Sequence, residues 1–73
     1  MTERQQQIYD FIVAYIQENL YAPSVREIGD AVELYSTSSV YAHLKALEKK
    51  GYIEVKENSP RAIKVIGYKF VKA

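Results

Sequence analysis

The stretch SVREIGDAVELYSTSSVYAHLKALEKKG, residues 24–51, decides the fold because it contains two helical patterns separated by only a few residues. Ser24 and Glu27 have the spacing of a capping box, which predicts the start of the first helix. Gly29 lies beside the apolar stripe of that helix, where a missing side chain lets another helix come close. The apolar residues recur at helical spacing: Val25, Ile28, Ala31 and Val32. This arrangement predicts a helix-turn-helix.

The second helix of the stretch begins after Ser36, which is the best N-cap among its neighbours. It runs to about Lys50, because Gly51 readily adopts the left-handed conformation that ends many helices. Its apolar residues are spaced by four and three and predict one buried stripe: Val40, Leu44 and Leu47.

Another helix is predicted ahead of this stretch, over about Glu3–Asn19. Thr2 and Gln5 form a capping box at its start. Pro23 forces Ala22 out of the helical region beyond its end. Its apolar residues recur at helical period: Ile8, Phe11, Ile12, Tyr15 and Ile16.

Two alternating segments follow Gly51, at residues 52–56 and 62–66, and the letters NSPR at 58–61 supply a turn between them. This pattern predicts an antiparallel β-hairpin. The expected fold class is α+β, mostly α: a winged helix-turn-helix of three helices followed by a two-stranded antiparallel wing, over residues 1–67.

The remaining tail, residues 68–73, is more apolar than a flexible linker, with Tyr68, Phe70 and Val71. Two roles stay open for it. It either extends the second wing strand and covers the small core, or it contacts a second subunit.

Composition narrows the function classes. Seventy-three residues make a single domain, and the absence of cysteine excludes disulfides and thiolate metal sites while fitting a reducing cytoplasm. His43 is the only histidine and leans towards the apolar stripe, so we expect no metal and no cofactor. No nucleophile–base pair is evident, so we expect no enzyme activity. No apolar run is long enough to span a membrane, and no small-molecule ligand is evident.

Charge is divided unevenly along the chain, although the whole chain has a net charge of only +1. Residues 1–36 contain two basic and six acidic side chains, whereas residues 37–73 contain eight basic and three acidic ones. Such a split favours a polyanion facing the second half, and the alternative is a solvated lysine surface.

The predicted helix that begins after Ser36 changes character along the side opposite its apolar stripe. Its first turns present hydroxyl and methyl groups and its later turns are basic, which suits a helix whose first turns meet base edges in the major groove of double-stranded DNA. The free N–H groups of the first turn, at Thr37, Ser38 and Ser39, favour phosphate. The alternative is that Ser36 caps and the other hydroxyls are idle surface. The residues of this face are Ser38, Ser39, Tyr41, Ala42, Lys45 and Lys49.

Four more residues are candidates for contacts to the DNA backbone. Arg26, near the start of its helix, can reach a phosphate across the groove or pair with Asp30 four residues on. Lys56, Asn58 and Arg61 flank the predicted turn of the wing, where side chains reach the backbone or the minor groove, or are merely solvated.

Three strings, PSVREIG at residues 23–29, HLKALEKKG at 43–51 and SPRAI at 59–63, occur in this order. With them, about residues 2–67 resemble the N-terminal DNA-binding domain of LexA-type SOS repressors of bacteria and phages. The resemblance implies a transcriptional repressor that occludes a palindromic operator as a homodimer, weakly associated or monomeric without DNA. It adds Arg4 as a backbone contact, and it implies base reading by Ser36, Ser38, Ser39, Tyr41 and Ala42.

The chain departs from the family in three respects, one of which is the bulky Tyr41 at a base-reading position. Glu33 stands where the family usually has a turn glycine, so either Glu33 takes a strained backbone or the turn differs. The resemblance does not reach the family's second domain, which dimerises and cleaves itself, so we carry over neither self-cleavage nor that domain's dimer interface. The main alternative function is a winged-helix protein-interaction module, or an antagonist of a repressor.

Overall fold

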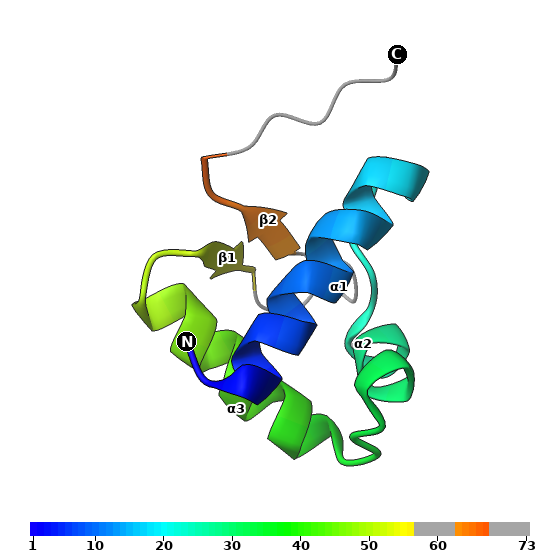
Figure 1. Ribbon diagram of the computed structural model, residues 1–73, viewed down its shortest axis with the longest axis vertical. Coiled ribbons are helices and arrows are strands. Elements are labelled where there is room, and N and C mark those ends of the chain that lie inside the picture. Colours follow the sequence, from blue (N-terminus) through cyan, green and yellow to red (C-terminus); the bar gives the residue numbers. More distant parts are fainter. Residues whose placement is uncertain (57–62, 68–73) are drawn as a thin grey trace.

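The computed structural model describes residues 1–56 and 63–67, in which three helices precede a two-stranded antiparallel sheet (Figure 1). The expected winged helix-turn-helix architecture is confirmed. The predicted tail, residues 68–73, lies outside the described residues. The elements are α1 (Glu3–Asn19), α2 (Val25–Val32), α3 (Thr37–Lys49), β1 (Ile53–Val55) and β2 (Ile63–Val65).

Both predicted capping boxes are present. The Thr2 hydroxyl accepts the Gln5 N–H at 3.2 Å, and the Gln5 side chain accepts the Thr2 N–H at 3.3 Å. Ser24 and Glu27 repeat this arrangement at the start of α2, at 3.1 and 2.9 Å. Each box satisfies two backbone donors that the helix itself leaves free, and a side-chain cap of this kind stabilises a helix by about 1 kcal/mol.

The start of α3 differs from this scheme. Ser36 occupies the N-cap position as predicted, but its hydroxyl makes no capping hydrogen bond. Only its carbonyl contributes, by accepting the Val40 N–H at 3.2 Å. The Ser36 hydroxyl therefore makes no hydrogen bond to the helix that Ser36 begins.

One apolar core joins the helices to the sheet. The strands pair in the register Ile53–Val65, Glu54–Lys64 and Val55–Ile63, which turns alternate side chains towards the helices. All three predicted helical stripes contribute buried residues: Ile8, Ile12, Ile16, Ile28, Val40, Leu44 and Leu47. The strands add Ile53, Ile63 and Val65.

The turn between α2 and α3 closes tightly over Gly29. The Leu34 N–H donates to the Gly29 carbonyl at 2.8 Å. A Cβ atom at Gly29 would lie 2.5 Å from the Leu34 carbonyl oxygen and 3.4 Å from Cγ2 of Val40. The absence of a side chain therefore sets how closely α2, the turn and α3 approach one another.

We predict that Gly29→Ala destabilises the domain by about 2 kcal/mol, because the added methyl group displaces backbone rather than a flexible side chain. The melting temperature should fall by roughly 10 °C in a domain of this size. Thermal unfolding followed by circular dichroism measures the change. Asp30→Ala, at an exposed position in the same helix, is the control, and an equal melting temperature for both variants would contradict the prediction.

Candidate nucleic-acid interface

The exposed face of α3 has the composition that the sequence predicts. The helix runs along the side of the molecule opposite the C-terminal end of α1 (Figure 1). With its apolar stripe buried, the opposite face is open to solvent. The predicted base-reading residues lie there: Ser36, Ser38, Ser39 and Ala42 are exposed, and Tyr41 is half-buried.

Four exposed hydroxyl groups surround the N-terminus of α3, those of Ser36, Thr37, Ser38 and Ser39. In the part of the chain that the structure describes, none of them takes part in a side-chain hydrogen bond. The first turn also contains no acidic residue. Free N–H groups, free hydroxyls and the positive end of the helix dipole therefore meet at one place, which suits polar and anionic groups.

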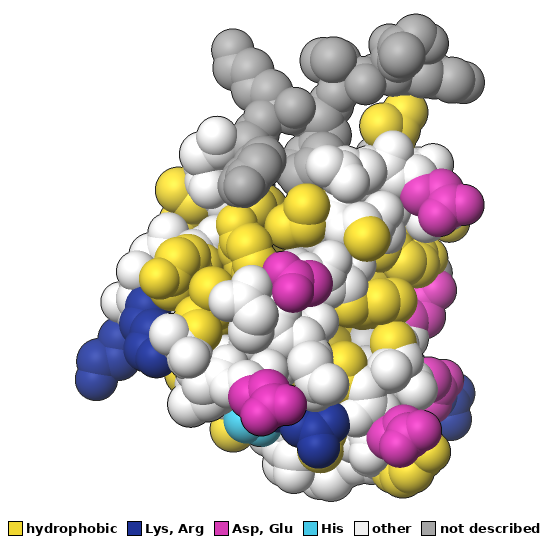
Figure 2. Space-filling model, in the orientation of Figure 1, with side chains coloured by type: hydrophobic (Ala, Val, Ile, Leu, Met, Phe, Trp, Pro, Cys, Tyr) yellow, Lys and Arg dark blue, Asp and Glu magenta, His cyan; other side chains and the backbone are white. Residues whose placement is uncertain are grey.

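The predicted backbone-contacting residues around this face differ in their surroundings. Arg26, Lys49 and Lys56 are exposed, and no ion pair joins Arg26 to Asp30 within residues 1–56 and 63–67. Figure 2 shows the Lys and Arg side chains of the viewed face separated from one another, with acidic side chains between them. The charge of the described residues on the face viewed in Figure 2 is scattered rather than gathered into one patch.

The wing turn adds two predicted contacts, Asn58 and Arg61, which lie outside the described residues. They remain predictions. The base of the wing is described on both strands, and Lys56 directly follows β1.

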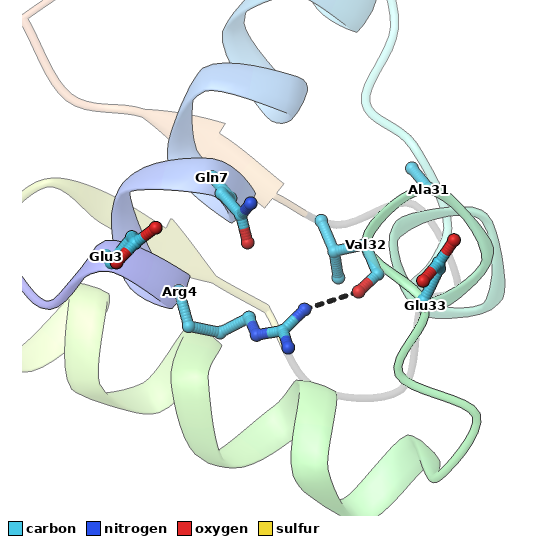
Figure 3. Close-up of a pocket in the computed structure, with 6 residues that line it drawn as sticks. All are labelled: Glu3, Arg4, Gln7, Ala31, Val32 and Glu33. Atoms are coloured by element: carbon cyan, nitrogen blue, oxygen red, sulfur yellow. Dashed lines mark hydrogen bonds between the residues drawn. The ribbon is translucent and has the colours of Figure 1, made fainter.

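Arg4 has a partner within the protein. Its guanidinium, from α1, donates a hydrogen bond to the carbonyl of Val32 at the end of α2 (Figure 3). The contact lies in a pocket formed with Glu3, Gln7, Ala31 and Glu33. Arg4 thus satisfies a carbonyl that α2 leaves free at its C-terminus, and its predicted phosphate contact remains untested.

Glu33, which follows α2, adopts the left-handed conformation with φ 59° and ψ 38°. The turn is therefore kept without a glycine, at the cost of strain in the backbone. This is the first of the two possibilities that the sequence left open.

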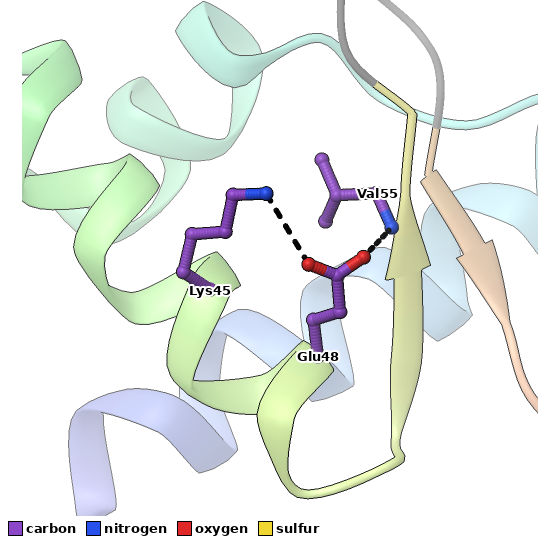
Figure 4. Close-up of polar contacts among 3 residues, drawn as sticks. All are labelled: Lys45, Glu48 and Val55. Carbon is purple, nitrogen blue, oxygen red and sulfur yellow. Dashed lines mark hydrogen bonds and ion pairs between the residues drawn. The ribbon is translucent and has the colours of Figure 1, made fainter.

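Glu48 of α3 makes a polar contact with the wing at Val55, and it also contacts Lys45 of its own helix (Figure 4). One carboxylate oxygen of Glu48 accepts the Val55 N–H at 2.8 Å, and the other lies 3.3 Å from Nζ of Lys45. The Val55 hydrogen bond, followed by that from Lys45, lowers the pKa of Glu48 from its ordinary 4.5. Glu48 therefore stays ionised at neutral pH.

The sequence did not single out two residues of this region: Glu48, which contacts both Val55 and Lys45, and the exposed Tyr35. Tyr35 is 82% exposed and directly precedes Ser36, and its bulk and apolar character beside the hydroxyl row were the available signal. For Glu48 the spacing of three from Lys45 indicated an ion pair, but nothing in the sequence indicated a bond to the amide of Val55.

Other site types find no support in the described ranges, 1–56 and 63–67. They contain no cluster of three or more His, Cys, Asp or Glu side chains that could hold a metal ion. They also contain no helix long and apolar enough to cross a membrane. His43 is half-buried, as its spacing predicts.

A helix-turn-helix followed by a two-stranded wing, with an exposed hydroxyl-rich helix, defines the class of winged-helix DNA-binding domains. Comparison with known proteins gives the family: residues 1–62 match the LexA DNA binding domain. The chain belongs to this family.

Curated relatives agree with the family match. The chain is 55% identical over 67 residues to the LexA repressors of Bacillus mycoides (strain KBAB4) and Bacillus thuringiensis (strain Al Hakam). The alignments cover 92% of this chain, and 33% and 32% of those proteins. The chain thus spans about a third of the length of the curated relatives it matches.

We predict that Glu33→Gly stabilises the domain by about 1 kcal/mol, because glycine adopts the left-handed conformation without the penalty of a Cβ atom. Urea unfolding at neutral pH measures the effect. Glu33→Gln keeps the Cβ atom and removes the charge, so it should change stability by less than about 0.5 kcal/mol. A Gln variant as stable as the Gly variant would attribute the gain to charge instead.

We also predict a pH-dependent contribution from Glu48. Its pKa is lower in the folded than in the unfolded state, so its contribution to stability is complete above pH 4.5 and is lost as the pH falls through the lowered pKa. The difference in unfolding free energy between wild type and Glu48→Gln should therefore be level near neutral pH and shrink in acid. Urea titrations from about pH 7 to about pH 3 test this, and a difference independent of pH would refute it.

Proposed function

We propose that this domain is a sequence-specific transcriptional repressor that inserts the N-terminal half of α3 into the major groove of double-stranded DNA. The observation that supports this most directly is the row of four exposed hydroxyl groups at the start of α3, on the side opposite its buried stripe. Serine and threonine hydroxyls both donate and accept, so they can bond to base edges or to phosphates.

Base reading is assigned to Ser36, Ser38, Ser39, Tyr41 and Ala42. Their small size, apart from Tyr41, lets the helix backbone come close to the floor of the groove. The methyl group of Ala42 suits contact with a thymine methyl group. Tyr41 can donate its hydroxyl to a phosphate or press its ring on a thymine methyl group.

Contacts to the DNA backbone orient the helix. The residues in this role are Arg26, Thr37, Lys45, Lys49, Lys56, Asn58, Arg61 and Arg4. The exposure of Arg26, Thr37, Lys49 and Lys56 supports it, whereas Arg4 would have to exchange its bond to the Val32 carbonyl for one to a phosphate.

Repression follows by occlusion of the promoter by two copies of the domain on an inverted repeat. The curated relatives are named LexA repressor, and a single domain offers few contacts for tight binding. A homodimer on DNA, weakly associated without it, joins two half-sites and doubles the contacts.

A protein-interaction module is the second candidate, and exposed apolar side chains at the other end of the molecule favour it. Leu20, Tyr21 and Ile66 are 43%, 50% and 47% exposed. Leu20 and Tyr21 line a groove with Ile63 and Val65 of β2. A partner bound there would depend on Tyr21 and not on Tyr41.

Selection of bound duplexes from a random pool at fixed salt, followed by a salt titration on the best sequence, tests the proposal. We expect an inverted repeat, and a slope of log affinity against log salt of about −4 to −5 if about five phosphates are engaged. Ser39→Ala and Tyr41→Ala should relax selectivity at individual positions, with a cost of about 1–3 kcal/mol each at the preferred site.

Tyr21→Ala is the matched control, because it removes an exposed tyrosine at the far end of the molecule. It should leave the selected sequence and its affinity unchanged. Binding that is nearly independent of salt, or that is lost in Tyr21→Ala and kept in Tyr41→Ala, contradicts the proposal and favours the protein-interaction module.

A further inference from the structure

Glu48 is the residue through which α3 and the wing share a polar anchor. It projects from the last part of α3 and uses its two carboxylate oxygens for different partners: Oε2 accepts the backbone N–H of Val55, and Oε1 lies beside Nζ of Lys45 (Figure 4). One side chain therefore touches both the wing and a residue predicted to bind DNA phosphate.

The Val55 bond fixes the wing at a sensitive point. Val55 is the last residue of β1, and Lys56 follows it on the way to the wing turn. Within residues 1–56 and 63–67 the sheet has two strands of three residues each, and such a hairpin is marginally stable on its own. Its inner end is held by the buried side chain of Ile53, so a bond at Val55 fixes the direction in which the outer part leaves the core.

The two bonds of Glu48 differ in strength. The Val55 bond is short for an N–H donor, at 2.8 Å, and the ionised acceptor strengthens it. The Lys45 contact is longer, at 3.3 Å, and Lys45 is 46% exposed at its side chain. Exposed pairs of this kind contribute little to stability. Lys45 can therefore leave Glu48 for a phosphate without breaking the bond to the wing, because the bonds use separate oxygens.

We propose that Glu48 is a positioning residue for DNA binding. Its bond to the Val55 amide holds the wing at a fixed angle to α3, while Lys45 leaves Glu48 to bind a DNA phosphate. This inference rests on the proposed function. Glu48 itself reads no base. Its effect reaches DNA through Lys45 and through Lys56, which follows β1 towards the wing turn.

A pair of substitutions separates the bond from the charge. Glu48→Gln removes the negative charge but keeps an oxygen that accepts the Val55 N–H, whereas Glu48→Ala removes both. The two variants have equal net charge, so any difference between them reports the bond. We expect Glu48→Ala to bind the selected duplex about three- to tenfold more weakly than Glu48→Gln, as for the loss of one hydrogen bond.

The salt slope distinguishes wing positioning from loss of folded protein. If the wing loses one phosphate contact, the slope for Glu48→Ala should be shallower by about one than for Glu48→Gln. Partial unfolding would lower the active fraction and leave the slope unchanged. Amide hydrogen exchange without DNA provides a separate check, since the Val55 amide should exchange faster in Glu48→Ala than in Glu48→Gln.

Glu54→Ala and Glu54→Gln form the matched control pair. Glu54 is an exposed carboxylate on β1 with no hydrogen bond to any described residue. We expect equal affinities and slopes within this pair, measured at a temperature where unfolding curves show all variants folded.

The outcomes separate this inference from the proposed function. Wild-type protein that shows no salt-dependent binding to duplex DNA overturns both. Wild-type binding with equal affinities for Glu48→Ala and Glu48→Gln, or with weaker binding and an unchanged slope for Glu48→Ala, overturns only the positioning role. A weaker Glu48→Ala with a shallower slope, and rescue in Glu48→Gln, supports it.

Discussion

The orientation of α3 depends on its close approach to α2 and to the turn between them. Gly29 leaves room for the Leu34 carbonyl, which would lie 2.5 Å from any Cβ atom there, and Val40 of α3 packs on the same point. Because Val40 is buried with Leu44 and Leu47, the helical period turns the Ser38, Tyr41 and Lys45 side of α3 towards solvent. A displacement of α3 at its contact with Gly29 would rotate or shift the exposed side of the helix that carries Ser38, Tyr41 and Lys45.

Local signals predicted the architecture well. Capping boxes operate over three residues and apolar stripes over one or two turns, so Thr2, Ser24 and the burial of Val40 could be inferred from spacing alone. The left-handed Gly51 after α3 and the apolar alternation that predicts the two strands belong to the same kind of signal, whereas the pairing register came only from the structure. The family resemblance then assigned base-reading roles that spacing alone does not give.

Polar contacts between elements could not be predicted in this way. Arg4 bonds to Val32 across 28 residues, and Lys50 donates to the side chain of Gln5 across 45 residues at 3.0 Å. Their formation depends on the final packing of α1 against α2 and α3, and no periodicity encodes it. The same holds for the missing capping bond of Ser36, because a capping residue type does not determine which rotamer its hydroxyl adopts.

These contacts bear on how the proposed repressor would achieve selectivity. Lys45 is paired with Glu48, and Arg4 is engaged by the Val32 carbonyl, so part of the charge that we propose for phosphate contacts is occupied within the protein. Affinity independent of sequence comes mainly from phosphate neutralisation, so the engagement of Lys45 and Arg4 within the protein reduces what one domain can contribute. The hydroxyl groups discriminate only once α3 has entered the groove. A second copy on the adjoining half-site adds both kinds of contact together, so selectivity under this mechanism resides in the spacing and symmetry of the two half-sites as well as in the base contacts within each.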